Sequence, residues 1–413
     1  MSVMMSLIGI VSLLAVGYLL SDNRSAVRWR TVGGAFLIQA SIAALVIYVP
    51  FGQQILLSIT NAVQSVIDSA QVGISFLFGG LGTDAMFANG VGFVFAVRVL
   101  PIIVFFSSLI AVLYYLGVMQ WVIRVIGGAL QKLLNISRPE SMSATANIFV
   151  GQTEAPLVVR PFIPTMTQSE LFAIMVGGLA SVAGSVLAGY AGMGVELKYL
   201  IAACFMAAPG GLMMAKLMKP EVDAPRQDIQ ELENEAQEDA PANVLDAAAQ
   251  GASSGLKLAL NVGAMLLAFI ALIALLNSMV GGVASWFGQD GVSIELLLGY
   301  VFSPLAFLIG VPWSEALQAG SYIGQKLVLN EFIAYADFVE NRDALSIHSQ
   351  LIVTFALCGF ANLSSIAILL GGIGGMAPNR RSDIARMGIK AVVAASMANF
   401  MSAALAGLFF SLS

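Results

Sequence analysis

The 413-residue chain is 58% hydrophobic and only 10% charged, with a mean hydropathy of +0.88. Soluble globular proteins carry about 25% charged residues, so this composition excludes a soluble protein and predicts an integral membrane protein. The net charge of −5 reflects a local concentration, because nine of the 24 Asp and Glu residues lie between Glu221 and Asp246. The basic residues are scattered over short loops, which argues against a nucleic-acid partner.

The first feature along the chain is a series of long apolar stretches. A bilayer core about 30 Å thick needs roughly 20 apolar helical residues. Uncharged stretches of about this length predict eight transmembrane helices in an all-α fold. They lie at 1–21, 31–50, 99–123, 171–195, 199–215, 258–289, 349–379 and 391–413.

Basic residues in the connecting loops predict the orientation of these spans. Lys and Arg residues follow the first, third, fifth and seventh spans, and such loops face the cytoplasm. Both ends of the chain are then expected outside the cell. The residues are Arg24, Arg28, Arg30, Arg124, Lys132, Arg138, Lys216, Lys219, Arg380, Arg381 and Arg386.

Two segments between the spans are of a different kind. Residues 53–78 carry apolar side chains at helical spacing, which predicts an amphipathic helix lying on the membrane surface or covering a partner. Residues 219–250 begin with an acidic, proline-containing run that is too polar to bury. We interpret this run as a cytoplasmic linker that divides the chain into two halves.

Each half contains the same unusual pattern. Residues 139–166 and 313–345 are apolar but interrupted by polar residues near their middle, and each precedes a broken span, 168–195 or 349–374. We expect two re-entrant helical hairpins that enter the membrane from opposite sides. Inverted repeats with broken helices are the sequence pattern of secondary transporters. The two hairpin tips are expected to meet near the midplane around one water-filled cavity.

The polar residues of these segments are the candidate site. Glu154 and Glu331 are carboxylates inside intramembrane segments, where ionisable residues are costly and usually functional. A structural ion pair is the alternative for each. Neutral polar residues near the hairpin tips and breaks could bind a ligand or bond neighbouring helices. They are Asn147, Gln152, Thr153, Asn362, Ser364 and Ser365.

A break at Ser181 could free backbone carbonyls. Asn147 and Ser181, with the carbonyls of Val150 and Val182, would supply the neutral oxygens that a monovalent cation such as sodium binds. Close packing of small residues is the alternative at this position.

Four motifs closely resemble the bacterial concentrative nucleoside transporters, and the likeness extends over nearly the whole chain. The resemblance implies a sodium-coupled symporter that takes nucleosides such as uridine into the cell, as a homotrimer in the bacterial inner membrane. The motifs are ESMSATANIFVGQTEAPLVVRP, GGLASVAGSVLAGY, NEF at 330–332 and CGFANLSSIAILLGG.

The resemblance also implies an elevator-type division of the chain into a scaffold part and a moving transport part. Residues 1–135 and 251–312, the latter with span six and an external helix, form the scaffold part. Residues 136–218 and 313–413 form the two transport repeats, whose last spans are 199–217 and 383–413.

By the same likeness, the first hairpin faces the nucleobase and the second faces the ribose. Gly151 lets the tip approach the ligand, and Phe360 closes one side of the pocket. Sodium would lie between the first tip and the first break. The base-facing residues are Gln152, Thr153, Glu154 and Val186, the ribose-facing residues are Glu331, Asn362 and Ser365, and the sodium ligands are Asn147, Val150, Ser181 and Val182.

Rival functions make different predictions. A proton-coupled nucleoside symporter would use Glu154 or Glu331 as its titrating group. A channel or receptor would not accumulate substrate against a gradient. An enzyme is disfavoured because no nucleophile–base pair or phosphate-binding loop stands out in the sequence.

Overall fold

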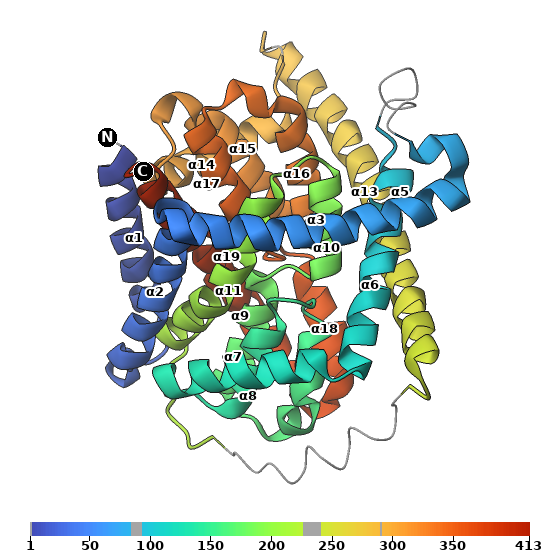
Figure 1. The fold of residues 1–413 in the computed structure, drawn as a ribbon. Helices are drawn as coiled ribbons and strands as arrows, with labels where there is room; N and C mark the ends of the chain where they lie inside the picture. The colour runs from blue at the N-terminus through green and yellow to red at the C-terminus, as the bar shows by residue number, and fades with distance from the viewer. Residues whose placement is uncertain (1, 84–92, 226–240, 290) are drawn as a thin grey trace.

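The computed structural model describes residues 2–83, 93–225, 241–289 and 291–413, and the regular elements in these ranges are all helical. The middle of the acidic linker, residues 226–240, lies outside the described residues. The N-terminal third contains α1 (Ser2–Leu19), α2 (Trp29–Ala43), α3 (Pro50–Phe78), α5 (Phe95–Arg98) and α6 (Leu100–Tyr115). Helix α3 contains the whole of the expected amphipathic segment 53–78, and it lies across the other helices (Figure 1).

The third predicted span is shorter than expected. The sequence predicts one helix over 99–123, but Gly117 adopts a left-handed conformation with φ of 78° and ends it. The chain then starts a new helix, α7 (Val118–Leu134), which lies across the end of the molecule (Figure 1). The expectation that this span extends to residue 123 is therefore wrong, because glycine permits a turn that other residues avoid.

The first repeat consists of a hairpin, a broken helix and a continuous helix. Its elements are α8 (Arg138–Ala146), the 3-10 segment η5 (Ala155–Thr165), α9 (Gln168–Ala180), α10 (Gly184–Gly192) and α11 (Leu197–Met218). Ser137 and Thr167 begin α8 and α9 with capping boxes, in which Glu140 and Glu170 accept from the cap backbone.

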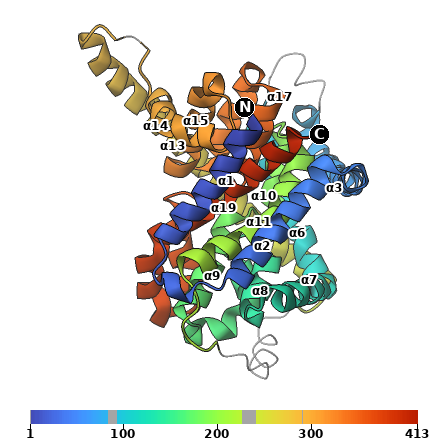
Figure 2. The same cartoon turned by 90° about the vertical axis from the view of Figure 1, so that its left-hand side faces the viewer.

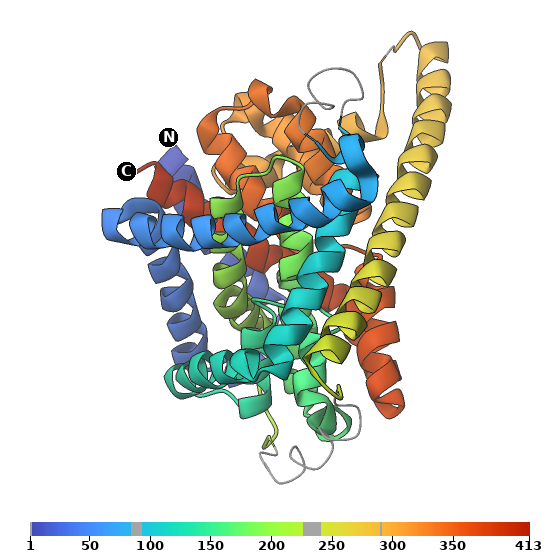
Figure 3. The same cartoon turned by 45° about the vertical axis from the view of Figure 1, so that its right-hand side comes forward.

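The second repeat follows the long helix α13 (Val244–Trp286), which stands at one side of the molecule beside α6 (Figure 3). Helix α14 (Ile294–Leu308) lies between α13 and this repeat. The elements of the repeat are α15 (Trp313–Val328), α16 (Glu331–Asn341), α17 (Ile347–Leu357), α18 (Ser365–Met376) and α19 (Arg381–Phe410). Helices α15 and α16 form the second hairpin, and α17 and α18 are the halves of the second broken helix. The breaks lie in the segments SVAGS (181–185) and CGFANLSS (358–365), inside the two spans expected to be broken, 168–195 and 349–374.

Six helices of the described residues are long and apolar enough to cross a bilayer, and α14 with α15 would form a seventh, bent by 117°. Val3–Leu19 and the two halves of the second broken helix are shorter apolar helices. In the three spans of the repeats, Gln168–Gly192, Leu197–Met218 and Pro378–Phe410, 83–94% of the residues in the apolar stretch are buried within the chain. The share is only 17–33% in Trp29–Tyr48, Phe95–Tyr115 and Val244–Trp286. The repeats therefore form the core, and the other spans present apolar faces outward.

The two chain ends lie at the same end of the molecule (Figure 2). At the opposite end, Asp22 links the loop after α1 to Lys219, at 3.0 Å, and to Lys390. Partial burial raises the pKa of Asp22, but hydrogen bonds and charge attraction from the two lysines outweigh burial and leave that pKa below its ordinary value.

Candidate functional site

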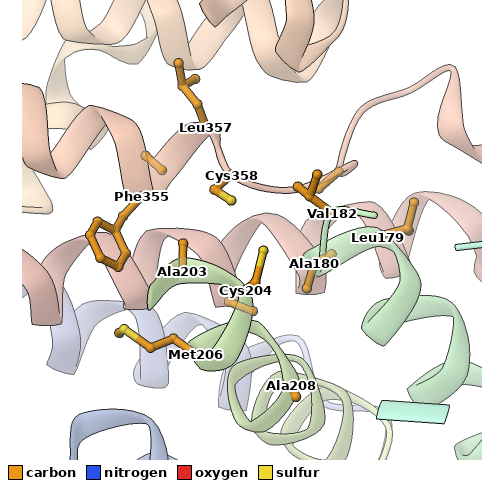
Figure 4. Packing of buried hydrophobic residues seen from close by; sticks show 14 of the residues in the cluster. Leu179, Ala180, Val182, Ala203, Cys204, Met206, Ala208, Phe355, Leu357 and Cys358 are labelled. Atoms are coloured by element: carbon orange, nitrogen blue, oxygen red, sulfur yellow. The ribbon is translucent and has the colours of Figure 1, made fainter. Parts of the chain in front are cut away.

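The two breaks cross each other at the centre of the core. The Phe360 amide donates to the Ser181 carbonyl at 3.2 Å, so the break of one repeat is bonded to the break of the other. Asn399 on α19 donates from its side-chain nitrogen to the carbonyls of Ala180, at 2.7 Å, and Cys358, at 3.0 Å. Figure 4 shows Ala180, Val182 and Cys358 from the two breaks close together. Asn399 thus bonds the carbonyls freed where α9 and α17 end.

The tip of the first hairpin packs directly on the first break. The Phe149 carbonyl accepts from the Gly184 amide at 2.9 Å, where α10 begins. A side chain at Gly178 would meet the Cβ of Gln152 at 3.0 Å. The short helix α8 therefore ends against the broken helix, and small residues on α9 permit this approach.

Asn147, at the end of α8, has a buried side-chain amide that the described residues leave unpaired. Its side chain is 1% exposed, and neither its oxygen nor its nitrogen has a hydrogen-bond partner among the residues that the structure describes. Buried amides are almost always paired, so Asn147 is a candidate for binding a partner from outside the protein. Ser181 and Val182 are also buried, and the Ser181 hydroxyl makes only a long 3.4 Å bond to the Gly178 carbonyl.

The other first-tip candidates occupy different surroundings. Gln152 is buried, and its amide oxygen has no hydrogen-bond partner in the described part of the chain. The Glu154 carboxylate accepts from the Gly151 amide at 2.9 Å and is exposed. The methyl group of Thr153 faces α18, where a side chain at Gly372 would approach it to 3.0 Å. Of these three residues, Gln152 is the one with an unsatisfied buried polar atom.

The second tip is organised around Glu331, which is 4% exposed at the start of α16. Its two oxygens each accept one bond at 3.0 Å, from the Tyr190 hydroxyl and from the Asn362 amide. Asn362 is fixed in turn by the Ser364 hydroxyl and the Ser365 amide, which both donate to its oxygen. A carboxylate has about four acceptor positions, so Glu331 retains capacity for a hydroxylated ligand.

Tyr190 is a further residue of the candidate site, and it is absent from the residues predicted from the sequence. It lies in the motif GGLASVAGSVLAGY, and its ring packs against the rings of Phe332 and Tyr335. The ring centroids are 4.7 Å and 4.6 Å apart. Helix α10 thereby links both tips. The amide of Gly184, its first residue, donates to the Phe149 carbonyl, and the Tyr190 hydroxyl donates to Glu331. Val186 lies between them on α10 and is buried. The position of Tyr190 within the motif was the available signal.

A cavity of about 1240 Å³ lies beside the first tip. Glu154, Val150 and Phe149 line its wall, together with Ser185 of α10 and residues of α6, α7, α8 and α13. Glu331 does not line this cavity. The sequence predicts one cavity around both hairpin tips, but only the first-tip carboxylate, Glu154, lines this cavity. Helix α10 links the two tips through Gly184 and Tyr190.

Comparison with known proteins agrees with this architecture. Family profiles match residues 199–407, described as the C-terminus of the Na+ dependent nucleoside transporter, and residues 8–81, described as its N-terminus. A third profile, described as nucleoside recognition, matches residues 96–196. An uncharacterized transporter of Haemophilus influenzae is 58% identical over 100% of this chain and 99% of its own length. The nucleoside permease NupC of Helicobacter pylori is 48% identical over the same shares.

Solved structures of CNTnw have the same fold. CNTnw in an inward-facing substrate-bound state is 59% identical, with a TM-score of 0.96 over 100% of this chain and 99% of that one. A CNTnw variant in an outward-facing state gives a TM-score of 0.97 at 58% identity, with 100% of both chains covered. The fold and the buried polar site define a multi-pass membrane transporter. The chain belongs to the Na+-dependent, concentrative nucleoside transporter family.

Proposed function

We propose that this chain is a symporter that couples sodium entry to nucleoside uptake across the bacterial inner membrane. The observation that carries the proposal is the buried, unpaired amide of Asn147 beside the first break, in a core that also holds the Glu331 carboxylate. The Asn147 amide oxygen lacks a partner among the described residues, and a cation could provide one. The Glu331 carboxylate accepts two bonds and has further acceptor positions for a hydroxylated ligand. The family description supports sodium as the coupling ion and does not favour the proton alternative.

Sodium is proposed to bind between the first tip and the first break. The oxygens of Asn147 and Ser181 and the backbone carbonyls of Val150 and Val182 would supply its ligands. Neutral oxygens suit a monovalent cation, because they replace its hydration shell without adding charge. The unpaired amide oxygen of Asn147 supports this role.

The nucleoside is proposed to bind between the two tips. Its ribose hydroxyls would donate to Glu331, which Asn362 and Ser365 help to orient. Its base edge would face Gln152, which can both donate and accept. The remaining residues proposed to contact the ligand are Gly151, Thr153, Glu154, Val186 and Phe360.

Coupling follows from the shared first tip. Sodium bound at Asn147 would order the tip that carries Gln152, so that the nucleoside meets a preformed site. One sodium with one neutral nucleoside moves one charge, which is worth about 2.3 kcal/mol at 100 mV. A tenfold sodium gradient adds about 1.4 kcal/mol, and the sum supports roughly 500-fold accumulation.

We propose an elevator-type movement in which the two repeats carry the site across the membrane. Both hairpins would be re-entrant, and the spans with outward apolar faces would provide the scaffold. The high burial of the repeat spans supports a compact moving body. CNTnw structures in inward-facing and outward-facing states support alternating access. Exposed apolar residues on α13, such as Leu267 and Trp286, are compatible with subunit contacts in a homotrimer.

The coupling is tested by uptake of labelled uridine into proteoliposomes at fixed pH. An inward sodium gradient should drive uptake above the external concentration, because the ion releases free energy as it enters. A proton gradient at equal sodium should drive none. Uphill uptake that follows protons instead of sodium would contradict the proposal, and equilibration alone would indicate a channel.

The sodium site is tested by replacing Asn147 with alanine. The half-maximal sodium concentration for uptake should rise about 10- to 100-fold, because the cation loses a side-chain oxygen worth roughly 1.5–3 kcal/mol. Asn379→Ala is the matched control, since Asn379 lies outside the site and its exposed side chain donates to the Pro164 carbonyl at 3.3 Å. An unchanged sodium dependence in Asn147→Ala would remove this residue from the site.

A further inference from the structure

Lys326, near the end of α15, is a fully buried charged residue with no role in the site described above. Its side chain is 0% exposed. Its ammonium group donates to the Ala356 carbonyl at 2.8 Å and to the Asn399 oxygen at 2.7 Å. Among the described residues no carboxylate forms an ion pair with it, although Glu331 exerts an attraction. A buried ammonium held mainly by neutral oxygens needs an explanation.

The other buried lysine shows what an ordinary arrangement looks like. Lys216 forms ion pairs with Glu140 and with Glu221, the latter at 3.5 Å. Lys326 instead has a carbonyl and an amide oxygen, which are the ligand types proposed for sodium at the first break. Its carbonyl partner, Ala356, lies at the end of α17, where the helix dipole favours positive charge.

Asn399 connects Lys326 to the first repeat by hydrogen bonds. Its oxygen accepts from Lys326, while its nitrogen donates to the carbonyls of Ala180 and Cys358. An amide whose oxygen faces a cation must turn its nitrogen toward acceptors. Lys326 therefore fixes which way Asn399 points. Ala180 immediately precedes Ser181, so the orientation of Asn399 sets the backbone at the proposed sodium site.

We propose that the Lys326 ammonium is a built-in cation at the break of the second repeat, in the place that a mobile sodium takes at the first. Acting through Asn399, it positions the backbone at Ala180 and Ser181 for sodium binding. This inference rests on the proposed sodium coupling. It makes Lys326 a positioning residue, and it predicts that only one break per chain takes up a mobile ion.

Two substitutions separate the charge of Lys326 from its volume. Lys326→Met fills the space without a cation, and the sodium concentration for half-maximal uridine uptake should rise at least about tenfold, because bonds from a charged donor are lost. Lys326→Ala leaves a space lined by the Ala356 carbonyl and the Asn399 oxygen. A second sodium can enter it, so uptake should depend on sodium more steeply, with a Hill coefficient rising from about one toward two.

Chemical rescue provides the matched comparison. Methylammonium should lower the half-maximal sodium concentration of Lys326→Ala toward that of the unaltered chain, since it restores a cation in the vacated space. It should not rescue Lys326→Met, in which the space is filled. Wild-type sodium dependence in Lys326→Met would overturn the proposal, and so would equal responses of both variants to methylammonium.

Two further measurements apply if the Lys326 variants do not fold. Asn399→Ala keeps the bond from Lys326 to Ala356 but removes the link to Ala180, and it should raise the half-maximal sodium concentration similarly. The unaltered chain in proteoliposomes should move one sodium per uridine, measured from the reversal potential; two would overturn the inference. Sodium-independent uptake by the unaltered chain would contradict the proposed coupling itself, which is a different result.

Discussion

Replacing Glu331 with glutamine is expected to weaken uridine binding by about 10- to 100-fold. Glutamine keeps the size of the side chain but loses the negative charge that ribose hydroxyls would meet. Hydrogen bonds to charged groups contribute roughly 1.5–3 kcal/mol each, and 1.4 kcal/mol is tenfold in affinity. The Tyr190 hydroxyl and the Asn362 amide both donate to Glu331 at 3.0 Å. The side-chain nitrogen of glutamine is also a donor, so it would face one of these two donors without an acceptor between them.

The substrate itself supplies the sharpest comparison for this variant. Deoxyuridines that lack one ribose hydroxyl should bind the unaltered protein more weakly than uridine, and Glu331→Gln should narrow that difference. Binding is measured by calorimetry on the purified protein in saturating sodium. Glu196→Gln is the control, since Glu196 is exposed and its carboxylate forms a long ion pair of 3.9 Å with the Lys198 ammonium. Equal losses for uridine and its deoxy analogues in Glu331→Gln would place the ribose elsewhere.

Replacing Gly359 with alanine is expected to disrupt the point where the two breaks cross. A Cβ at this position would lie 2.8 Å from the Ala180 carbonyl oxygen and closer still to the Asn399 side chain. Neither group can retreat easily, because Asn399 also bonds Lys326 and Cys358. Forcing a methyl group into a packed interior costs about 1–3 kcal/mol. We expect a lower unfolding temperature and loss of sodium-dependent uptake.

Gly371→Ala is the matched control for this substitution. Gly371 lies in α18, and a Cβ there meets nothing within 4 Å. Alanine is favoured over glycine in a helix by up to about 1 kcal/mol, so stability should be unchanged or slightly higher. Thermal unfolding of both purified variants measures the difference. A Gly359→Ala protein as stable and active as the Gly371→Ala protein would show that the crossing tolerates displacement.

The sequence predicted the breaks well because their cause is local. Small and polar residues in SVAGS and CGFANLSS interrupt apolar runs, and such backbone is tolerated only where protein or water surrounds it. The turn at Gly117 is equally local but was missed, because the apolar run continues through it into α7. A single glycine inside an apolar stretch does not distinguish a tolerated residue from a helix end.

The contacts of the site were less predictable because they join distant parts of the chain. Tyr190 and Glu331 are 141 residues apart, and Asn399 lies 219 residues from Ala180. Lys326 reads in the sequence as one basic residue in a moderately polar segment, and only the fold shows that it is buried against Asn399. Periodicity and composition likewise could not predict that Glu331 is buried and does not line the cavity.

Sodium at the first break and the nucleoside between the tips are proposed to bind cooperatively. Uridine affinity of the purified protein, measured by calorimetry as choline is replaced by sodium at constant ionic strength, tests this cooperativity most directly. We expect uridine affinity to rise with sodium concentration, and we expect Asn147→Ala to need far more sodium for the same rise. Equal uridine affinity in choline and in sodium would contradict it.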